Sequence, residues 1–209
     1  MQIRPEYGQY ASMMRQHVAT GTDLEVDARF VDMLVARHAA ILDVGCGHGS
    51  AVNALRRSGH LAFGIDPTPV ILKIATDRFN PAWFRDLGAE QISPPTLREV
   101  GLPSAYDLVL MAGNIPAFLS DAALAMALAQ VVAVLKPGVF LVVGTTVRAQ
   151  GGPQDLDGAA AAAGLLRRQR FADWYLGRYG EDPRWSVSVF QSPGEPPAAP
   201  GPDGIFILS

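Results

Sequence analysis

A glycine-rich segment between an apolar run and a helical pattern is the feature that most constrains how this chain folds. Residues 43–49 read Asp-Val-Gly-Cys-Gly-His-Gly, so glycines stand at 45, 47 and 49. The residues 40–44 (AILDV) are typical of a buried strand, and residues 50–57 have helical spacing that stops before Gly59. Glycines at such a turn let the backbone approach a ligand, and the amides that open the helix attract negative charge. The segment predicts a ligand-binding loop, with a tight turn that binds nothing as the alternative.

The spacing of these glycines disfavours a nicotinamide dinucleotide as the ligand. Counted from Gly45, the dinucleotide fingerprint G-x-G-x-x-G requires a glycine at position 50, where this chain has Ser50. Asp43 adds a carboxylate at the end of the strand, where it would repel a pyrophosphate and attract an ammonium or sulfonium group. We therefore expect a ligand that carries positive charge near this loop.

Apolar runs and helical patterns alternate after the loop, which is typical of a doubly wound α/β protein with a mostly parallel sheet. Thr68 and Pro69 predict the start of a helix that runs to about Phe79, and Ser120 predicts the cap of a helix that ends at Pro137. The region between the third and fourth strands, residues 87–105, is expected to be mostly loop. After the first strand, the predicted strands are residues 61–65, 82–85, 106–111 and 139–143.

The two ends of the chain have different patterns. Residues 6–18 and 23–37 predict two helices, which we assign to a small N-terminal helical cap over residues 1–39. Residues 171–176 and 185–190 predict a terminal hairpin, and they close a core that we assign to residues 40–191. Residues 192–209 are rich in Pro and Gly and predict an extended tail.

Acidic residues stand at the ends of two further predicted strands. Asp66 ends the second strand, so in a doubly wound sheet its carboxylate lies in the ligand crevice, where it can accept both hydroxyls of a ribose. The alternative is an aspartate that starts a turn before Pro67. Asp86 ends the third strand and can accept from the exocyclic amine of adenine, with an ordinary loop aspartate as the alternative. These positions favour a nucleoside ligand.

Taken together, these segments resemble the class I S-adenosylmethionine-dependent methyltransferases. ILDVGCGHGS is similar to the first motif of that family, GID ending in Asp66 to its ribose-binding turn, and YDLVLMAGN to its fourth-strand motif. LKPG before VFLVV resembles the recurrent turn into the fifth strand, although Val139 replaces its usual second glycine. The resemblance covers residues 40–145 and implies a Rossmann-like, seven-stranded sheet whose last strand runs antiparallel.

The resemblance also implies S-adenosyl-L-methionine as the cofactor and assigns residues to it. It places Asn114, in the loop after the fourth strand, near the transferred methyl group, where its side chain can orient an acceptor; an ordinary turn residue is the alternative. A general base is optional, since the methyl carbon is already activated and alignment supplies much of the catalysis. The implied cofactor-binding residues around the loop, the ribose and the adenine are Asp43, Gly45, Cys46, Gly47, Gly49, Asp66, Pro67, Asp86 and Leu87.

The first predicted helix carries a stripe of large side chains. Tyr7, Tyr10 and Met14 share one face, and Arg15 follows them. Such a stripe usually packs against a core, but in the resembling family an N-terminal helix with tyrosines often folds over the cofactor. We expect Tyr7, Tyr10 or Arg15 to close the cofactor site, with core packing as the alternative.

Composition limits the acceptor and the compartment. The 209 residues carry a formal net charge of −3 and no basic stripe, which argues against a nucleic-acid partner. Cys46, the single cysteine, forms no internal disulfide, and no apolar run reaches the length of a membrane span. We expect a cytoplasmic, single-domain methyltransferase with a small-molecule acceptor and no metal.

Two side chains of the glycine loop could have catalytic roles, and two other protein classes are alternatives to a methyltransferase. His48 could act as a base, but we interpret it as a variable loop side chain, and we interpret the Cys46 side chain as small-residue packing. A non-catalytic nucleoside-binding protein would keep the same pocket and lack a productive acceptor site. The NAD-binding module of an oxidoreductase is the other rival. Cofactor binding and turnover separate these classes.

Overall fold

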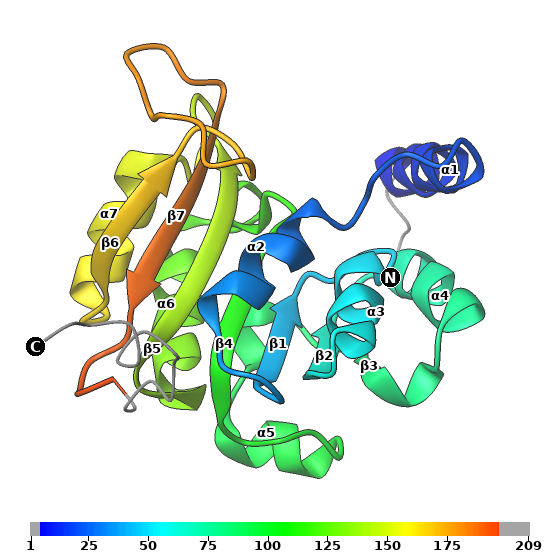
Figure 1. The fold of residues 1–209 in the computed structure, drawn as a ribbon, viewed down its shortest axis with the longest axis horizontal. Helices are drawn as coiled ribbons and strands as arrows, with labels where there is room; N and C mark the ends of the chain where they lie inside the picture. The colour runs from blue at the N-terminus through cyan, green and yellow to red at the C-terminus, as the bar shows by residue number, and fades with distance from the viewer. Residues whose placement is uncertain (1–4, 197–209) are drawn as a thin grey trace, which may run out of the picture.

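The computed structural model describes residues 5–196, and within the first helix it describes only the backbone of residues 5–7, 10, 11 and 18. Seven strands form one sheet in the order β3-β2-β1-β4-β5-β7-β6 (Figure 1). The last strand, β7, is antiparallel to both of its neighbours, and the remaining pairs are parallel, as the resemblance implied. The strands are β1 (Ala40–Val44), β2 (Leu61–Ile65), β3 (Phe84–Arg85), β4 (Tyr106–Met111), β5 (Leu135–Thr146), β6 (Leu166–Phe171) and β7 (Trp185–Gln191).

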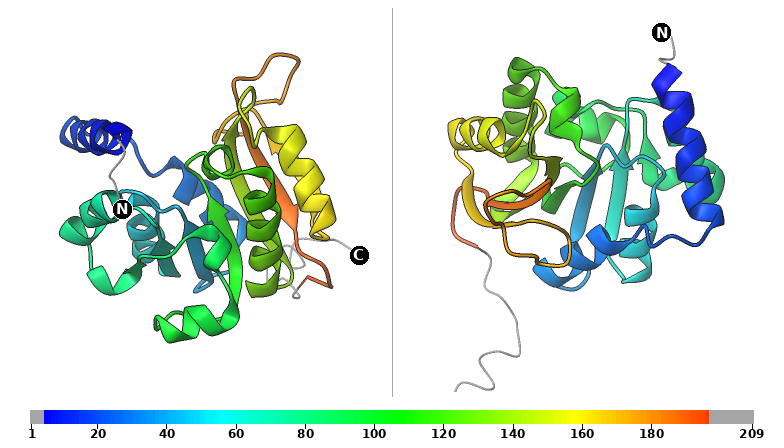
Figure 2. Two further views of the ribbon diagram at one scale, coloured as in Figure 1. Left: turned by 180° about the vertical axis from the view of Figure 1, so that it is seen from behind. Right: turned by 90° about the horizontal axis from the view of Figure 1, so that it is seen from above.

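Helices cover both faces of this sheet (Figure 2). Buried residues of α2, α3 and α4 share one hydrophobic cluster with the sheet, and those of α5, α6 and α7 share the other. The helices are α1 (Pro5–Ala19), α2 (Val26–Leu34), α3 (Ser50–Arg57), α4 (Pro69–Arg78), α5 (Pro94–Glu99), α6 (Asp121–Val134) and α7 (Pro153–Ala162), with short 3-10 turns η1 (Pro81–Trp83), η2 (Ala89–Gln91) and η3 (Ile115–Phe118). The doubly wound architecture is therefore confirmed.

The central strands are buried on both faces, which explains their continuous apolar sequences. In β1, Leu42 and Val44 belong to the cluster under α5, α6 and α7, whereas Ile41 belongs to the cluster under α2, α3 and α4. Side chains alternate along a strand, so Asp43 lies on the same face as Ile41. This alternation directs the Asp43 carboxylate toward the α2 and α3 side of the sheet.

Local signals set several of the helix ends. Ser120 caps α6, since its Oγ accepts a hydrogen bond from the amide of Ala123 at 3.3 Å. Gly59 follows α3 with φ +90°, the left-handed conformation that suits a glycine after a helix. Pro69 is the first residue of α4, as predicted, although Thr68 makes no side-chain cap bond there. Where the sequence predicted mostly loop, α5 provides one short helix, and β5 begins immediately after α6.

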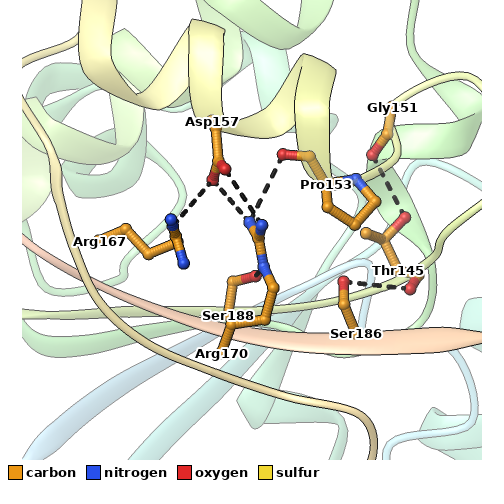
Figure 3. A network of polar contacts seen from close by, with 8 residues as sticks. All are labelled: Thr145, Gly151, Pro153, Asp157, Arg167, Arg170, Ser186 and Ser188. Atoms are coloured by element: carbon orange, nitrogen blue, oxygen red, sulfur yellow. Dashed lines mark hydrogen bonds and ion pairs between the residues drawn. The ribbon is translucent and has the colours of Figure 1, made fainter. Parts of the chain in front are cut away.

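The predicted position of the first strand in the terminal hairpin is wrong. Residues 171–176 were expected to form it, but β6 spans Leu166–Phe171, and residues 172–184 form the connection to β7. Because β6 is the edge of the sheet, it tolerates charged side chains that a central strand excludes. Arg170 pairs with Asp157 of α7 at 2.6 Å and donates to Ser188 of β7 at 2.8 Å (Figure 3). The densest basic cluster of the sequence, Arg167, Arg168 and Arg170, is therefore part of the sheet, and the side chain of Arg170 is only 8% exposed.

The two N-terminal helices occupy different places. α2 packs on α3 and buries Ala28, Phe30 and Val31, so it belongs to the helical layer over the sheet. α1 lies against α4 (Figure 2), and Met14 is its buried side chain among those described. Within residues 5–196, none of the helices combines the length and hydropathy that a membrane crossing requires.

Candidate cofactor site

The glycine loop joins the carboxyl end of β1 to α3 and is fixed to β2. Gly45, Gly47 and Gly49 have φ angles of +73°, +54° and +76°, so all three occupy the left-handed region that glycine adopts without strain. The amides of Gly45 and Cys46 both donate to the carbonyl of Ile65, at 2.8 and 3.0 Å. The turn predicted from the sequence is therefore held at the end of β2 by backbone hydrogen bonds.

Packing within the protein also requires two of these glycines. A Cβ atom at Gly45 would lie 2.0 Å from Cδ1 of Ile115, in the segment after β4. A Cβ atom at Gly49 would lie 2.8 Å from both the Cβ of Ala75 and the Cζ of Phe84. Ligand approach alone, the reason given by the sequence pattern, does not account for these glycines, because protein atoms already fill the space beside them.

Asp66 is connected to the glycine loop through its carboxylate. The side chain is buried, its Oδ2 accepts from the amide of Gly47 at 3.1 Å, and its Oδ1 accepts from the amide of Thr68 at 2.8 Å. Burial raises the pKa of Asp66, while the two amides act in the opposite direction. Each carboxylate oxygen has a further lone pair, so both can still accept a hydroxyl group.

Asp43 is the most buried carboxylate of the site, with 3% of its surface exposed. Among the described residues, none donates a hydrogen bond to it or forms an ion pair with it. Burial raises its pKa well above the usual range, and the charges of Asp27 and Asp66 add to this effect. Such a carboxylate lacks the partner that a buried charge ordinarily needs, which suits it to a cationic ligand group.

The other predicted cofactor residues follow the same strand ends. Asp86 is exposed and Leu87 is buried directly after β3, and Pro67 is exposed after β2. Asp86 lies near enough to Asp66 to contribute to its raised pKa. Asp43, Asp66 and Asp86 thus end three adjacent strands on one edge of the sheet, as expected for a nucleoside crevice.

Two loop side chains have local roles. Nδ1 of His48 lies 2.9 Å from Oγ of Ser50 and accepts from the Ser50 amide at 3.3 Å. Burial, with help from Arg78 and His17, lowers the pKa of His48 to about 4, so its ring is neutral at pH 7. Burial also raises the pKa of the Cys46 thiol well above its usual value, which keeps it protonated.

Asn114 connects the segment after β4 to the end of β5. Its Oδ1 accepts three hydrogen bonds, from Oγ1 of Thr145 at 2.9 Å, from the amide of Thr146 at 2.9 Å and from Oγ1 of Thr146 at 3.1 Å. Its backbone is left-handed, with φ +64°. The carbonyl end of this side chain is therefore engaged, and the amide NH₂ is the end that can meet a ligand.

The described part of α1 gives a partial account of its predicted residues. The side chains of Tyr7 and Tyr10 lie outside what the structure describes, and Arg15 is exposed and hydrogen-bonded to Ser12 at 3.4 Å. His17 contributes to the lowered pKa of His48, so the end of α1 approaches the glycine loop. A role of Arg15 in closing the cofactor site stays a prediction.

Asp27, in the first turn of α2, is a carboxylate near Asp43 that the sequence reasoning did not single out. Burial raises its pKa to about 6, and its charge acts on Asp43. An acidic residue early in a helix is ordinary, so the sequence offers no signal that would single it out. Among residues 5–196, no group of three or more His, Cys, Asp or Glu side chains is arranged to hold a metal ion.

Comparisons with known proteins find a methyltransferase domain in this chain. A model of the methyltransferase domain matches residues 41–138, whereas no curated protein matches the sequence. A TehB-like S-adenosylmethionine-dependent methyltransferase from Corynebacterium glutamicum is 27% identical, with a TM-score of 0.80 over 90% of this chain and 100% of that one.

Two further solved structures share the fold at lower identity. CcbJ methyltransferase from Streptomyces caelestis is 19% identical, with a TM-score of 0.68 over 81% of this chain and 89% of that one. Magnesium protoporphyrin IX methyltransferase from Synechocystis was solved with bound S-adenosylmethionine. It is 15% identical, with a TM-score of 0.60 over 93% of this chain and 86% of that one. The matched domain, the sheet order and the strand-end carboxylates agree: residues 41–138 form a methyltransferase domain, the chain is similar to the class I S-adenosylmethionine-dependent methyltransferases, and S-adenosylmethionine is its cofactor.

Proposed function

We propose that this enzyme transfers the methyl group of S-adenosylmethionine to a small-molecule acceptor at the carboxyl ends of β4 and β5. The observation that carries the cofactor part of the proposal is the buried Asp66 carboxylate, which joins the glycine loop at Gly47 and keeps a free lone pair on each oxygen. The unpartnered Asp43 beside it fits a cofactor that carries positive charge. These residues therefore fit S-adenosylmethionine.

Each carboxylate has its own part in this proposal. Asp66 accepts the ribose hydroxyls, and Asp43 balances the cationic end of the cofactor. Asp86 and Leu87 border the adenine, the first as a hydrogen-bond acceptor and the second as an apolar surface. We assign these functions to the core 40–191, with α2 as part of its helical layer.

When bound, S-adenosylmethionine supplies a methyl carbon that is already activated by its sulfonium. The protein then has to align the acceptor with that carbon and exclude water. We assign acceptor orientation to the NH₂ group of Asn114, which the three hydrogen bonds to its Oδ1 hold in one direction. His48 and Cys46 are not proposed as bases, since the first bonds to Ser50 and the second is held as a neutral thiol.

A small-molecule acceptor is supported by the charge of the chain. The formal net charge is −3, and Arg170 and Arg167 of the densest basic cluster both pair with Asp157 instead of facing a phosphate backbone. Tight binding of duplex DNA or RNA at physiological salt, with a steep salt dependence, would contradict this assignment.

The test is calorimetry with S-adenosylhomocysteine and NADH, followed by turnover of S-adenosylmethionine with a panel of small amines, phenols, carboxylates and thiols. We expect binding of S-adenosylhomocysteine, no binding of NADH, and release of S-adenosylhomocysteine with at least one acceptor class. Binding without turnover across the panel would favour a non-catalytic nucleoside-binding protein. Binding of NADH alone would favour an oxidoreductase module.

A further inference from the structure

The first turn of α2 lies beside the glycine loop. Ala28 and Val31 of α2 are buried in one hydrophobic cluster with Ile41 of β1 and Cys46 of the loop. Asp27 directly precedes Ala28, and Asp43 shares the strand face of Ile41, which this cluster covers. The packing therefore brings the Asp27 side chain to the side of the sheet toward which Asp43 points.

The charges around α2 are unevenly compensated. Asp23 forms a salt bridge with Arg29, and Glu25 forms one with Arg57 at 2.6 Å. Within the described residues, no cationic side chain pairs with Asp27 or Asp43, although Asp27 is half-buried and Asp43 is buried. Two unpaired carboxylates in one partly buried place repel each other, and a cation bound between them would remove that cost.

Local hydrogen bonding leaves Asp27 available for a ligand. Its Oδ1 accepts from the amide of Ala28 at 2.8 Å, which fixes the carboxylate at the start of the helix. Its Oδ2 makes no hydrogen bond to a described residue. Asp43, 3% exposed and without a described partner, is the second observation that points to a missing positive group at this place.

We propose that Asp27 is a second carboxylate of the cofactor site, which acts together with Asp43 on the positive charge of the methionine end of S-adenosylmethionine. The inference rests on the cofactor site proposed above and extends it beyond the strand-end residues. Asp27 is a positioning and specificity residue: it favours cofactors that carry the amino acid group over nucleosides that lack it.

The test compares Asp27→Asn with Asp23→Asn, using calorimetry against three probes. S-adenosylmethionine carries both the sulfonium and the ammonium, S-adenosylhomocysteine carries only the ammonium, and 5′-methylthioadenosine carries neither. Asn keeps the shape of Asp27 and the bond from the Ala28 amide. Asp23→Asn removes a carboxylate from the same region that already has its partner in Arg29.

We expect Asp27→Asn to lower the affinity for S-adenosylmethionine and S-adenosylhomocysteine by roughly tenfold to hundredfold. This is the range for the loss of a charge-assisted contact. Its affinity for 5′-methylthioadenosine should match that of the wild type, and Asp23→Asn should bind all three as the wild type does. A larger loss for S-adenosylmethionine than for S-adenosylhomocysteine would assign Asp27 to the sulfonium, and equal losses would assign it to the ammonium.

Two results would overturn the inference while leaving the proposed function intact. One is wild-type affinity of Asp27→Asn for both charged probes, which would leave Asp27 as the cap of its own helix. The other is an equal loss for all three probes, which would mean that the substitution disturbs the loop and not a charge contact. Failure of the wild-type protein to bind S-adenosylmethionine or S-adenosylhomocysteine would instead refute the proposed function itself.

Discussion

Removing the charge of Asp27 should stabilise the ligand-free protein at neutral pH. Burial raises the pKa of Asp27 from 3.8 to about 6 in the folded state. Between these values the folded protein holds a proton that the unfolded chain releases. The contribution of Asp27 to the free energy of unfolding is therefore greatest below pH 4, decreases as the pH rises to about 6, and stays reduced above that. Asn at this position does not titrate, so the variant does not lose this stability as the pH rises.

The size of the effect follows from the difference in pKa. A rise in the pKa of Asp27 from 3.8 to about 6 on folding corresponds to a loss of at most about 3 kcal/mol in the free energy of unfolding at pH 7.5. The Asp27 side chain keeps some contact with solvent, and its charge favours the helix N-terminus by about 0.3–1 kcal/mol, so both reduce the gain. We expect the free energy of unfolding of Asp27→Asn to exceed that of the wild type by about 1–3 kcal/mol at pH 7.5. At pH 4 the two free energies should be about equal.

Urea unfolding of the ligand-free proteins at pH 4, 5, 6 and 7.5 measures this difference directly. Asp23→Asn is the matched control with the opposite sign: Arg29 lowers the pKa of Asp23, so removing that carboxylate should destabilise the protein near neutral pH. A stability difference for Asp27→Asn that does not change with pH, or a variant less stable than the wild type at pH 7.5, would refute the reasoning.

The remaining predictions concern the loop, the ribose site and the first helix. Asp66→Ala should weaken the binding of S-adenosylhomocysteine by about 2 kcal/mol, as measured by calorimetry. Unchanged affinity in a folded variant would indicate that Asp66 only forms a turn. Gly45→Ala should lower the melting temperature, because its Cβ would meet Ile115 at 2.0 Å, whereas Gly158→Ala in α7, with nothing within 4 Å, should raise it. If α1 closes over the cofactor, amides of residues 6–18 should gain hydrogen-exchange protection when S-adenosylhomocysteine is added; equal protection in both states would exclude a lid.

The sequence predicted the centre of the sheet well because burial on both faces leaves a plain signal. Residues 108–111 of β4 and 139–143 of β5 are continuous apolar runs, and the glycine loop marks the end of β1. The edge strand β6 was misplaced because its residues include Arg167, Arg168 and Arg170, a composition more typical of solvated surface than of a strand. The side chains of β6 are largely exposed, so the strand has no apolar run by which the sequence could indicate it.

The site could be predicted as far as strand ends determine it. Asp43 and Asp66 end parallel strands, so topology alone brings them to the same edge of the sheet. Asp27 reaches that edge through the packing of α2, and Asn114 depends on two threonines about thirty residues later in the chain. Contacts of this kind arise from tertiary packing, and no local pattern in the sequence encodes them.

The position of β7 between β5 and β6 has a consequence for synthesis of the chain. Among the strands that the structure describes, β6 pairs with β7 alone, and β5 meets β7 along Phe140–Thr146, yet β7 is translated last of the seven strands. Roughly forty residues follow β5 before Trp185, which takes about 2–8 s at ribosomal rates. During that interval the apolar β5 has an open edge on the nascent chain, the kind of edge that recruits chaperones or another strand. Substitutions in β7 should therefore lower the yield of folded protein in the cell more than their effect on the finished fold would indicate.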